Sequence, residues 1–453
     1  MINGAVTFPL DLAELSFTAS GDSLVRRTVL PSGVRILSER VPGARSATIG
    51  YWVAVGSRDE APETYGSTHF LEHLLFKGTA TRSALDIAVS FDAVGGEHNA
   101  MTAKEYTCYY AKVQDRDLPM AVEVIADMLT SSLLDPVEFE TERGVILEEL
   151  AMADDDPADA ASERFFEAVL GDHPLGRPIG GNPDTINAVT RDAVWQHYRA
   201  NYRAQDLVIT VAGAVDHDEL VAAVTSSLRH ADWNLNTTDA PVARRSATGD
   251  LIQRGSALKV VQRPIEQANI LLGVEGIAAT DPRRATLTVL NSILGGGMSS
   301  RLFQEIREKR GLAYSVYSFT PSYSDAGLFG IYAGCAPGKI GQVAELMLSE
   351  FRRLGTDGVT EEEMRRASGQ LSGASALALE DSDTRMSRLG RSELTLGEFV
   401  DLDESLRRIA LVTPDGIREL ATELAARPLS ISAVGTIDEN TFTGLAESPT
   451  PAR

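Results

Sequence analysis

The chain has 453 residues, which is too long for one ordinary hydrophobic core and indicates two or three domains. It carries 64 acidic and 42 basic residues, and the formal net charge of −22 argues against nucleic acid or an anionic membrane as the main partner. No run of about eighteen apolar residues occurs, so we expect no membrane span. The acidic balance fits either a solvated surface or a chamber that attracts basic peptides.

The cysteine content and the N-terminal residues bear on the cellular compartment of the protein. Cys108 and Cys335 are far apart in sequence, which fits a reducing environment better than a disulfide framework. Residues 1–22 show no basic start followed by an apolar core, and acidic residues precede the first arginine, Arg26. We therefore expect a bacterial-type cytoplasmic protein.

Hydrophobic periodicity predicts alternating strands and helices in both halves of the chain. In the first half, strand patterns cover residues 27–30, 34–38, 46–55, 100–113 and 207–212, and helix patterns cover 85–94, 118–129, 136–152, 160–170 and 190–198. In the second half, strand patterns cover 268–274, 313–320 and 329–333, and helix patterns cover 281–294, 300–310 and 340–354.

A polar stretch with Pro241, Gly249 and two adjacent arginines separates the halves and is typical of a linker. Because the order of elements repeats loosely after it, we predict an α+β fold of two domains of similar plan, each a mostly antiparallel sheet packed with helices. The expected divisions are an N-terminal extension at 1–23, a first domain at 24–235, a linker at 236–256, a second domain at 257–442 and a tail at 443–453.

The most informative motif is His69-Phe70-Leu71-Glu72-His73 in the first domain. On a helix, His69 and His73 are one turn apart, so both imidazoles can bind one Zn²⁺ ion. Glu72 would lie beside that ion, where a carboxylate can accept a proton from water. The alternative is three satisfied polar groups on a core helix, but burying them without a shared purpose is costly.

Two histidines leave a catalytic zinc site one protein ligand short. The helix pattern around residues 136–152 offers Glu142 and Glu149, which are two turns apart on one face, and Glu148, which is rotated away from Glu149. Any of the three could equally lie on a solvated face, so helical spacing alone does not choose among them.

The motif and the acidic helix together resemble the pitrilysin/insulinase family of zinc metallopeptidases, in particular the short-chain branch that includes the mitochondrial processing peptidases. In that family an E-x6-E pair follows H-x-x-E-H, and here Glu142 and Glu149 follow His73 by 69 and 76 residues, as in the family. The resemblance extends from about residue 25 to residue 440. It implies that Glu149 is the third zinc ligand and that Glu142 orients a ligating histidine.

Three further segments resemble the family. Residues 95–102 resemble its edge strand near the zinc, which implies that Asn99 and Ala100 hold the substrate backbone; the alternative is an ordinary Gly-Gly turn. Residues 294–302 resemble the glycine-rich loop of the short-chain branch. Arg307 and Tyr314 match the spacing of the family's arginine–tyrosine pair, which implies that they bind the scissile carbonyl and its oxyanion.

The resemblance implies a zinc endopeptidase of peptides or unfolded segments, with Glu72 as the base. The alternative is a non-catalytic, peptide-binding subunit or scaffold. Long-chain members join four such domains into a clamshell, so two domains would make half of the chamber. We therefore expect a homodimer, or a heterodimer with a similar chain, in which Arg307 and Tyr314 act on the partner's zinc site.

Overall fold

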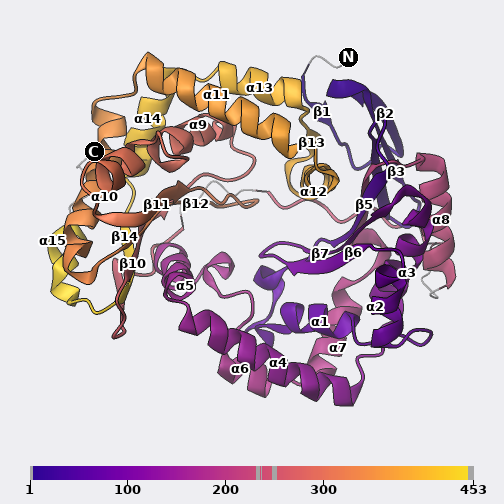
Figure 1. Cartoon of the computed structure of the whole chain (residues 1–453). Coiled ribbons are helices and arrows are strands. Elements are labelled where there is room, and N and C mark those ends of the chain that lie inside the picture. Colours follow the sequence, from indigo (N-terminus) through magenta and orange to yellow (C-terminus); the bar gives the residue numbers. More distant parts are fainter. Residues whose placement is uncertain (1–3, 231–234, 236, 247–251, 447–453) are drawn as a thin grey trace. The chain divides into compact units, whose positions relative to one another are not determined.

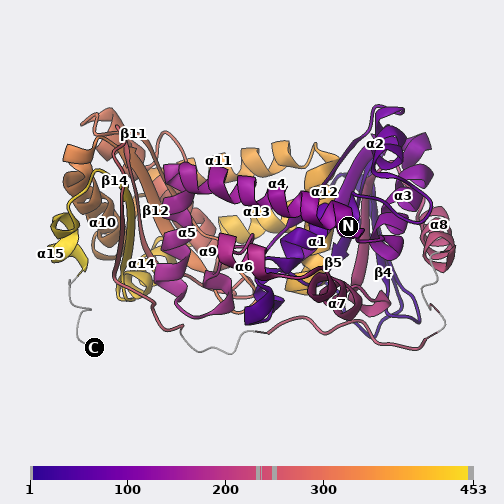
Figure 2. The same cartoon turned by 90° about the horizontal axis from the view of Figure 1, so that it is seen from below.

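The computed structural model describes residues 4–230, 235, 237–246 and 252–446. The chain forms two compact units (Figures 1 and 2), and each is made of segments that are not continuous in sequence. Unit 1 comprises residues 1–150, 178–244 and 376–404, and unit 2 comprises residues 151–177, 245–375 and 405–453. This division differs from the continuous ranges expected from sequence, and the expected linker and C-terminal tail lie partly outside the described residues.

Within the described residues, unit 1 contains a seven-stranded sheet in the order β2-β3-β4-β8-β5-β7-β6. Neighbouring strands are antiparallel except for β4 and β8, which are parallel. Strand β6 lies at one edge, where one side of its backbone has no partner strand in the sheet. The strands are β2 (Glu14–Ala19), β3 (Ser23–Val29), β4 (Arg35–Arg40), β5 (Ser46–Val53), β6 (Glu97–Thr102), β7 (Thr107–Gln114) and β8 (Leu207–Gly213).

In the part of unit 2 that the structure describes, five strands form a sheet in the order β11-β12-β10-β14-β9, again with one parallel pair, β9 and β14. Its strands are β9 (Leu258–Gln262), β10 (Ala268–Glu275), β11 (Ala313–Phe319), β12 (Leu328–Cys335) and β14 (Ser430–Gly435). Taken in chain order, they match β4, β5, β6, β7 and β8 of unit 1 in sheet position and direction. The predicted pair of similar α+β domains is therefore confirmed.

Helices cover both faces of the sheet in unit 1, so its central strands are buried on both sides. On β5, Tyr51 packs into one apolar core and its neighbour Trp52 packs into another. The Tyr51 core lies against helices α1, α3, α7 and α8, and the Trp52 core lies against α12. These helices are α1 (Ser67–Leu75), α3 (Leu118–Ser131), α7 (Arg191–Asn201), α8 (His217–His230) and α12 (Ser382–Arg391).

The sheet of unit 2 is covered in the same way. Its larger core packs against helices α9 (Arg284–Gly295), α10 (Ile340–Thr356) and α14 (Pro414–Ala425), and α5 (Pro157–Leu170) covers the other face. The other α-helices and strands of the described residues are α2 (Ala84–Asp92), α4 (Pro136–Asp155), α6 (Pro183–Ala188), α11 (Glu361–Ala378), α13 (Leu402–Ala410), α15 (Thr443–Ala446), β1 (Val6–Thr7) and β13 (Glu398–Phe399).

Helices α5 and α12 are exchanged between the halves of the chain. Helix α5 comes from the first half but packs through Phe165 and Val169 on the sheet of unit 2. Helix α12 comes from the second half but packs through Met386 and Leu389 on the sheet of unit 1. Each sheet thus gains the cover of its second face from the other half of the sequence.

Two sequence expectations are wrong. Residues 100–113 do not form one strand, because β6 ends at Thr102 and a turn closed by the Ala103 N–H and the Tyr106 carbonyl precedes β7. Residues 14–19, expected in a loosely attached extension, form β2, which pairs with β3. Phe8 is also buried, packed near Phe399.

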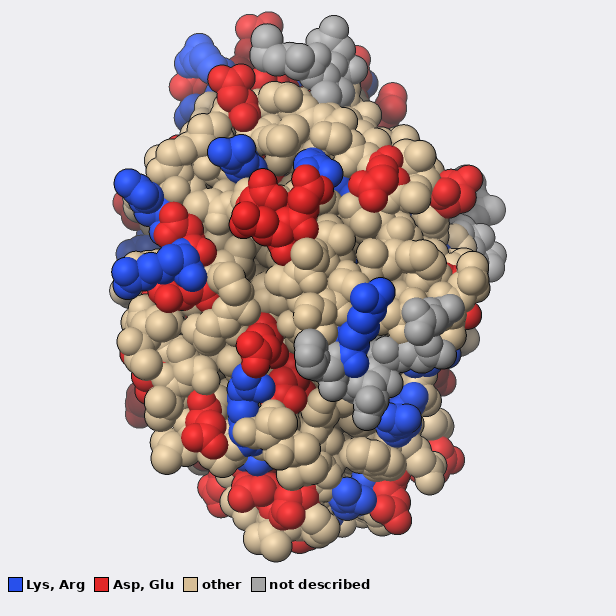
Figure 3. All heavy atoms as spheres, turned by 90° about the vertical axis from the view of Figure 1, so that its right-hand side faces the viewer, with Lys and Arg blue, Asp and Glu red and all other residues tan. Residues whose placement is uncertain are grey.

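None of the described helices combines the length and apolar character needed to cross a bilayer. Acidic and basic side chains are interspersed on the face drawn in Figure 3, so the acidic surplus does not form a single patch there.

Candidate metal centre

Helix α1 carries the motif, and its start is fixed by a buried carboxylate. The N–H groups of Gly66 and Thr68 donate to Glu60 Oε2 and Oε1 at 2.8 and 2.7 Å, so Glu60 caps the helix. Gly66 has φ of 92°, a conformation that favours glycine. The apolar face of α1 is buried in the core through Phe70, Leu71, Leu74 and Leu75, which leaves the motif's polar side chains on the opposite, partly exposed face.

Three potential metal ligands converge at this face. Glu149 Oε2 lies 3.8 Å from His69 Nε2 and 3.4 Å from His73 Nε2. One donor atom from each residue lies within 4.8 Å of the other two. The structure therefore brings together the two motif histidines and the glutamate that the resemblance selects.

Glu142 contacts His73 at Nδ1, the ring nitrogen that does not face Glu149. Its Oε2 accepts from His73 Nδ1 at 2.9 Å, and its Oε1 forms an ion pair with Lys77 Nζ at 2.6 Å. Because a carboxylate can only accept, His73 carries its proton on Nδ1 and presents a free lone pair on Nε2. The Glu142 side chain is 3% exposed, so its charge is held by these two partners.

The three glutamates on α4 that helical spacing offered as a third ligand differ in burial and in distance from the histidines. Glu142 is buried, whereas Glu149, two turns later, has a 46% exposed side chain at the convergence of the histidines. Glu148 is exposed and is not part of the group of donors.

The electrostatics of His69 favour metal binding. Burial lowers the pKa of His69 to about 4, and the neighbouring His73 acts in the same direction, so the ring is neutral near neutral pH. Neutral imidazole is the form that binds a metal.

Glu72 faces the same region but is not one of the three donors. Burial raises the pKa of Glu72, while its hydrogen bonds with Thr102 oppose that rise. The Thr102 hydroxyl donates to Glu72 Oε2 from the end of β6. A half-buried carboxylate beside a candidate metal site, with one oxygen held, is suited to proton transfer.

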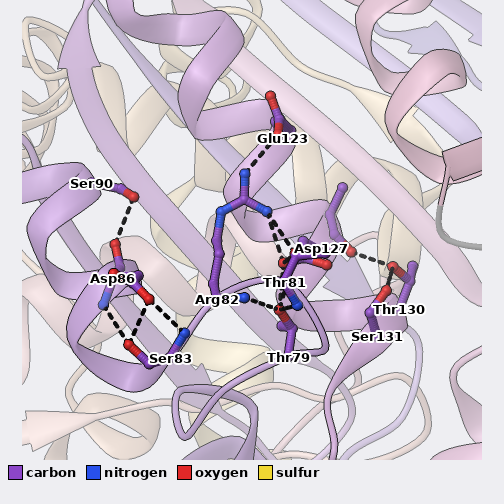
Figure 4. Close-up of polar contacts among 11 residues, drawn as sticks. Thr79, Thr81, Arg82, Ser83, Asp86, Ser90, Glu123, Asp127, Thr130 and Ser131 are labelled. Carbon is purple, nitrogen blue, oxygen red and sulfur yellow. Dashed lines mark hydrogen bonds and ion pairs between the residues drawn. The ribbon is translucent and has the colours of Figure 1, made fainter.

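The turn after α1 is held by a second carboxylate network (Figure 4). Asp127 Oδ2, on α3, accepts from the hydroxyls of Thr79 and Thr81 at 2.7 and 3.0 Å and from Arg82 Nη1 at 2.8 Å. Thr79 also accepts from the Arg82 N–H, and Arg82 Nη2 forms a 2.6 Å ion pair with Glu123. The network fixes the segment that carries Lys77.

Strand β6 places Asn99 and Ala100 at the sheet edge. The Ala100 N–H donates to the neighbouring Asn99 Oδ1 at 2.8 Å. His98 stacks on Phe91 with ring centroids 4.4 Å apart and takes no part in the donor group.

Arg307 and Tyr314 lie together in unit 2. The Arg307 guanidinium lies over the Tyr314 ring, 5.1 Å from its centroid, and also over Phe303 at 4.7 Å. Arg307 belongs to a π-helical turn, Phe303–Glu308, where a regular helix was expected. Tyr314 is 78% exposed on β11, the strand whose sheet position matches that of β6.

Sequence reasoning missed Thr102, Glu60 and Lys77. Lys77 directly follows the motif helix, but the two other residues act from a strand end and a loop. No spacing rule connects those positions to the motif.

Comparison with known proteins identifies the family. Residues 35–183 match the model for insulinase (peptidase family M16), and residues 188–371 match the model for the peptidase M16 inactive domain. The chain is 49% identical over 419 residues to an uncharacterized zinc protease of Streptomyces coelicolor, covering 92% of this chain and 91% of the relative.

The chain belongs to peptidase family M16. It is also 38% identical over 412 residues to an uncharacterized zinc protease of Bacillus subtilis, covering 91% of this chain and 98% of the relative. A solved structure described as the peptidase M16 inactive domain from Pseudomonas fluorescens shares the fold, with a TM-score of 0.80 at 20% identity and coverage of 91% of this chain and 98% of that one. The two-domain M16 architecture thus extends over nearly the whole chain.

Proposed function

We propose that this M16 chain is a zinc-dependent endopeptidase that cleaves peptides or unfolded segments. The observation that carries the proposal is the convergence of His69, His73 and Glu149 within 4.8 Å, with Glu72 beside them. The names of the relatives support zinc as the metal.

The donor set fits zinc. Two neutral imidazoles and one carboxylate are the ligands of many catalytic zinc sites. His73 is fixed in the required tautomer by Glu142, and His69 is neutral because its partial burial lowers its pKa to about 4. The described residues offer three ligands and not a closed cage of four, which supports a catalytic and not a structural ion.

The mechanism assigns proton transfer to Glu72. When bound, zinc supplies Lewis-acid chemistry that makes water a nucleophile near neutral pH and polarises the peptide carbonyl. Glu72 then accepts the proton of the attacking water and passes it to the nitrogen of the leaving amine. Asn99 and Ala100 hold the peptide backbone along β6 by strand addition.

Arg307 and Tyr314 complete the proposed machinery. Their cation–π contact holds the guanidinium beside the phenol, so the two donors can act on one carbonyl oxygen. The pair and the metal ligands belong to different units, and we propose that two chains form a dimer in which each pair acts on the partner's site.

The decisive experiment is mass spectrometry of unstructured peptides incubated with the zinc-loaded protein. We expect cleavage at internal peptide bonds that a chelator stops and that added zinc restores. The matched control is Glu72→Gln, which should bind the same peptides without cutting them. Peptide binding with no cleavage by the wild type would instead support the alternative, a peptide-binding subunit.

A further inference from the structure

We propose that Thr102 is a positioning residue for the Glu72 carboxylate, and that it ties the placement of this base to the strand on which the peptide docks. The inference rests on the proposed peptidase function and adds a residue to it. Thr102 is the last residue of β6, and its hydroxyl donates to Glu72 Oε2. The hydrogen bond joins two elements, α1 and β6, that are separate in sequence.

The alternation of side chains along β6 places the Thr102 side chain on the face that contacts α1. Along β6, exposure alternates, with Glu97, Asn99 and Met101 exposed and the residues between them half-buried. His98, which contacts Phe76 and Phe91, shares this inner side with Ala100 and Thr102. The hydroxyl that holds Glu72 is therefore on the side of β6 that faces the motif helix.

One oxygen of Glu72 is occupied by this contact, which restricts rotation of the carboxylate. A general base must lie within hydrogen-bond reach of the proton it takes. If the hydroxyl is removed, Glu72 loses the contact that fixes its side-chain torsions. A small displacement of a reacting group has a large effect on rate.

The turn after Thr102 is held by contacts with residues 56–58. The N–H groups of Ser57 and Arg58 donate to the carbonyls of Ala103 and Lys104 at 3.1 and 3.0 Å. Arg58 Nη1 also forms an ion pair with Glu105 at 2.6 Å. Gly56 approaches this turn so closely that a Cβ atom at position 56 would lie 2.4 Å from the Lys104 carbonyl carbon.

The same segment also fixes α1. Glu60 accepts the N–H groups at the start of that helix, only two residues after Arg58 contacts the β6–β7 turn. Residues 56–60 therefore bracket the helix that carries Glu72 and the turn that follows Thr102. Residues 56–60 thus connect the strand end that carries Thr102 to the helix that carries Glu72.

The test is steady-state peptide cleavage by Thr102→Val and Thr102→Ala, with Thr102→Ser as the conservative variant. We expect the Val and Ala variants to lose about 10- to 100-fold in kcat, with KM changed by less than about twofold, because the base is displaced while the docking edge remains. Thr102→Ser keeps a hydroxyl and should recover most of kcat. Zinc content should equal that of the wild type in all three.

Thr107→Val is the matched control. Thr107 lies directly opposite Thr102 in the β6–β7 ladder, but its hydroxyl donates to the Val55 carbonyl and not to Glu72. The Thr107→Val variant should retain wild-type kcat once folded, as judged by its thermal unfolding midpoint.

The positioning role would be overturned by wild-type kcat in Thr102→Val or Thr102→Ala, by a loss of kcat in Thr102→Ser equal to theirs, or by a change confined to KM. An inactive zinc-loaded wild type would instead refute the proposed function itself.

Discussion

Glu142 Oε2 accepts a 2.9 Å hydrogen bond from His73 Nδ1, on the opposite side of the ring from the atom that faces Glu149. The contact sets the tautomer of His73 and the direction of its free lone pair. Lys77 occupies the other oxygen of Glu142, so this buried carboxylate has a partner for each oxygen. The arrangement gives Glu142 and Glu149 different roles that substitution can separate.

The first prediction concerns metal content. Glu149→Gln should lose zinc, because it replaces a ligating carboxylate with a weak neutral donor. Glu142→Gln should bind zinc about 10- to 100-fold more weakly, since it perturbs the orientation of a ligand and not the ligand itself. Equilibrium titration with a competing chelator measures both. Glu148→Gln, one residue from Glu149 and outside the donor group, is the control, and a larger loss of zinc in this variant would contradict the assignment.

The second prediction separates chemistry from metal binding. Glu72→Gln should keep one zinc per chain and lose on the order of 10²–10⁴ in kcat, because an amide cannot accept the proton of the attacking water. Elemental analysis gives the stoichiometry, and a quenched-fluorescence peptide gives the rate. Turnover comparable to that of the wild type would remove Glu72 as the base.

The sequence was enough to place the two motif histidines together, because their relation is local. His69 and His73 lie one helical turn apart, and this spacing alone places two imidazoles on one side of a helix. The choice of Glu149 over Glu148 needed the family resemblance, since helical periodicity does not tell which face of α4 meets α1. The structure supplies that information by burying Glu142 and leaving Glu148 in solvent.

Tertiary relations were not predictable in this way. The exchange of α5 and α12 depends on which sheet each helix covers, and an apolar stripe fits either one. The turn at 103–106 lacks glycine and proline, so strand propensity concealed it. Thr102 was missed for a related reason, because its contact with Glu72 joins a strand end to a helix thirty residues away.

The third prediction is a pH dependence of stability. His217 is 4% exposed and lies between the hydroxyls of Thr28 and Ser38, and burial lowers its pKa to about 4. The unfolded chain, with a histidine pKa near 6.5, therefore binds the proton more tightly than the folded chain. The contribution of neutral His217 to the free energy of unfolding is complete above about pH 6.5, and it declines as the pH falls toward about 4.

The measurement is urea unfolding at about pH 7 and about pH 5, where protonation of this one group should remove about 2 kcal/mol. In His217→Gln the free energy of unfolding should be lower than that of the wild type at about pH 7, because the packing is altered, but its fall between the two pH values should be smaller by about 2 kcal/mol. An unchanged pH dependence in the variant would assign the effect to other groups.

The last prediction concerns assembly. The proposed metal ligands belong to unit 1, whereas Arg307 and Tyr314 belong to unit 2. If each pair acts on the partner's site, a mixed dimer of Glu72→Gln and Tyr314→Phe chains contains one site with both defects and one with none. Each homodimer is impaired at both of its sites. Mixing the two variants should therefore restore up to about a quarter of wild-type activity at equal amounts, because half of the dimers are mixed and each has one intact site.

Subunit exchange must be verified with two mass-distinguishable tags. Mixing Glu72→Gln with Glu149→Gln chains is the control that should restore nothing, because both defects lie in unit 1. Activity that stays flat across mixing ratios after verified exchange would show that the pair acts within its own chain or takes no part in the reaction.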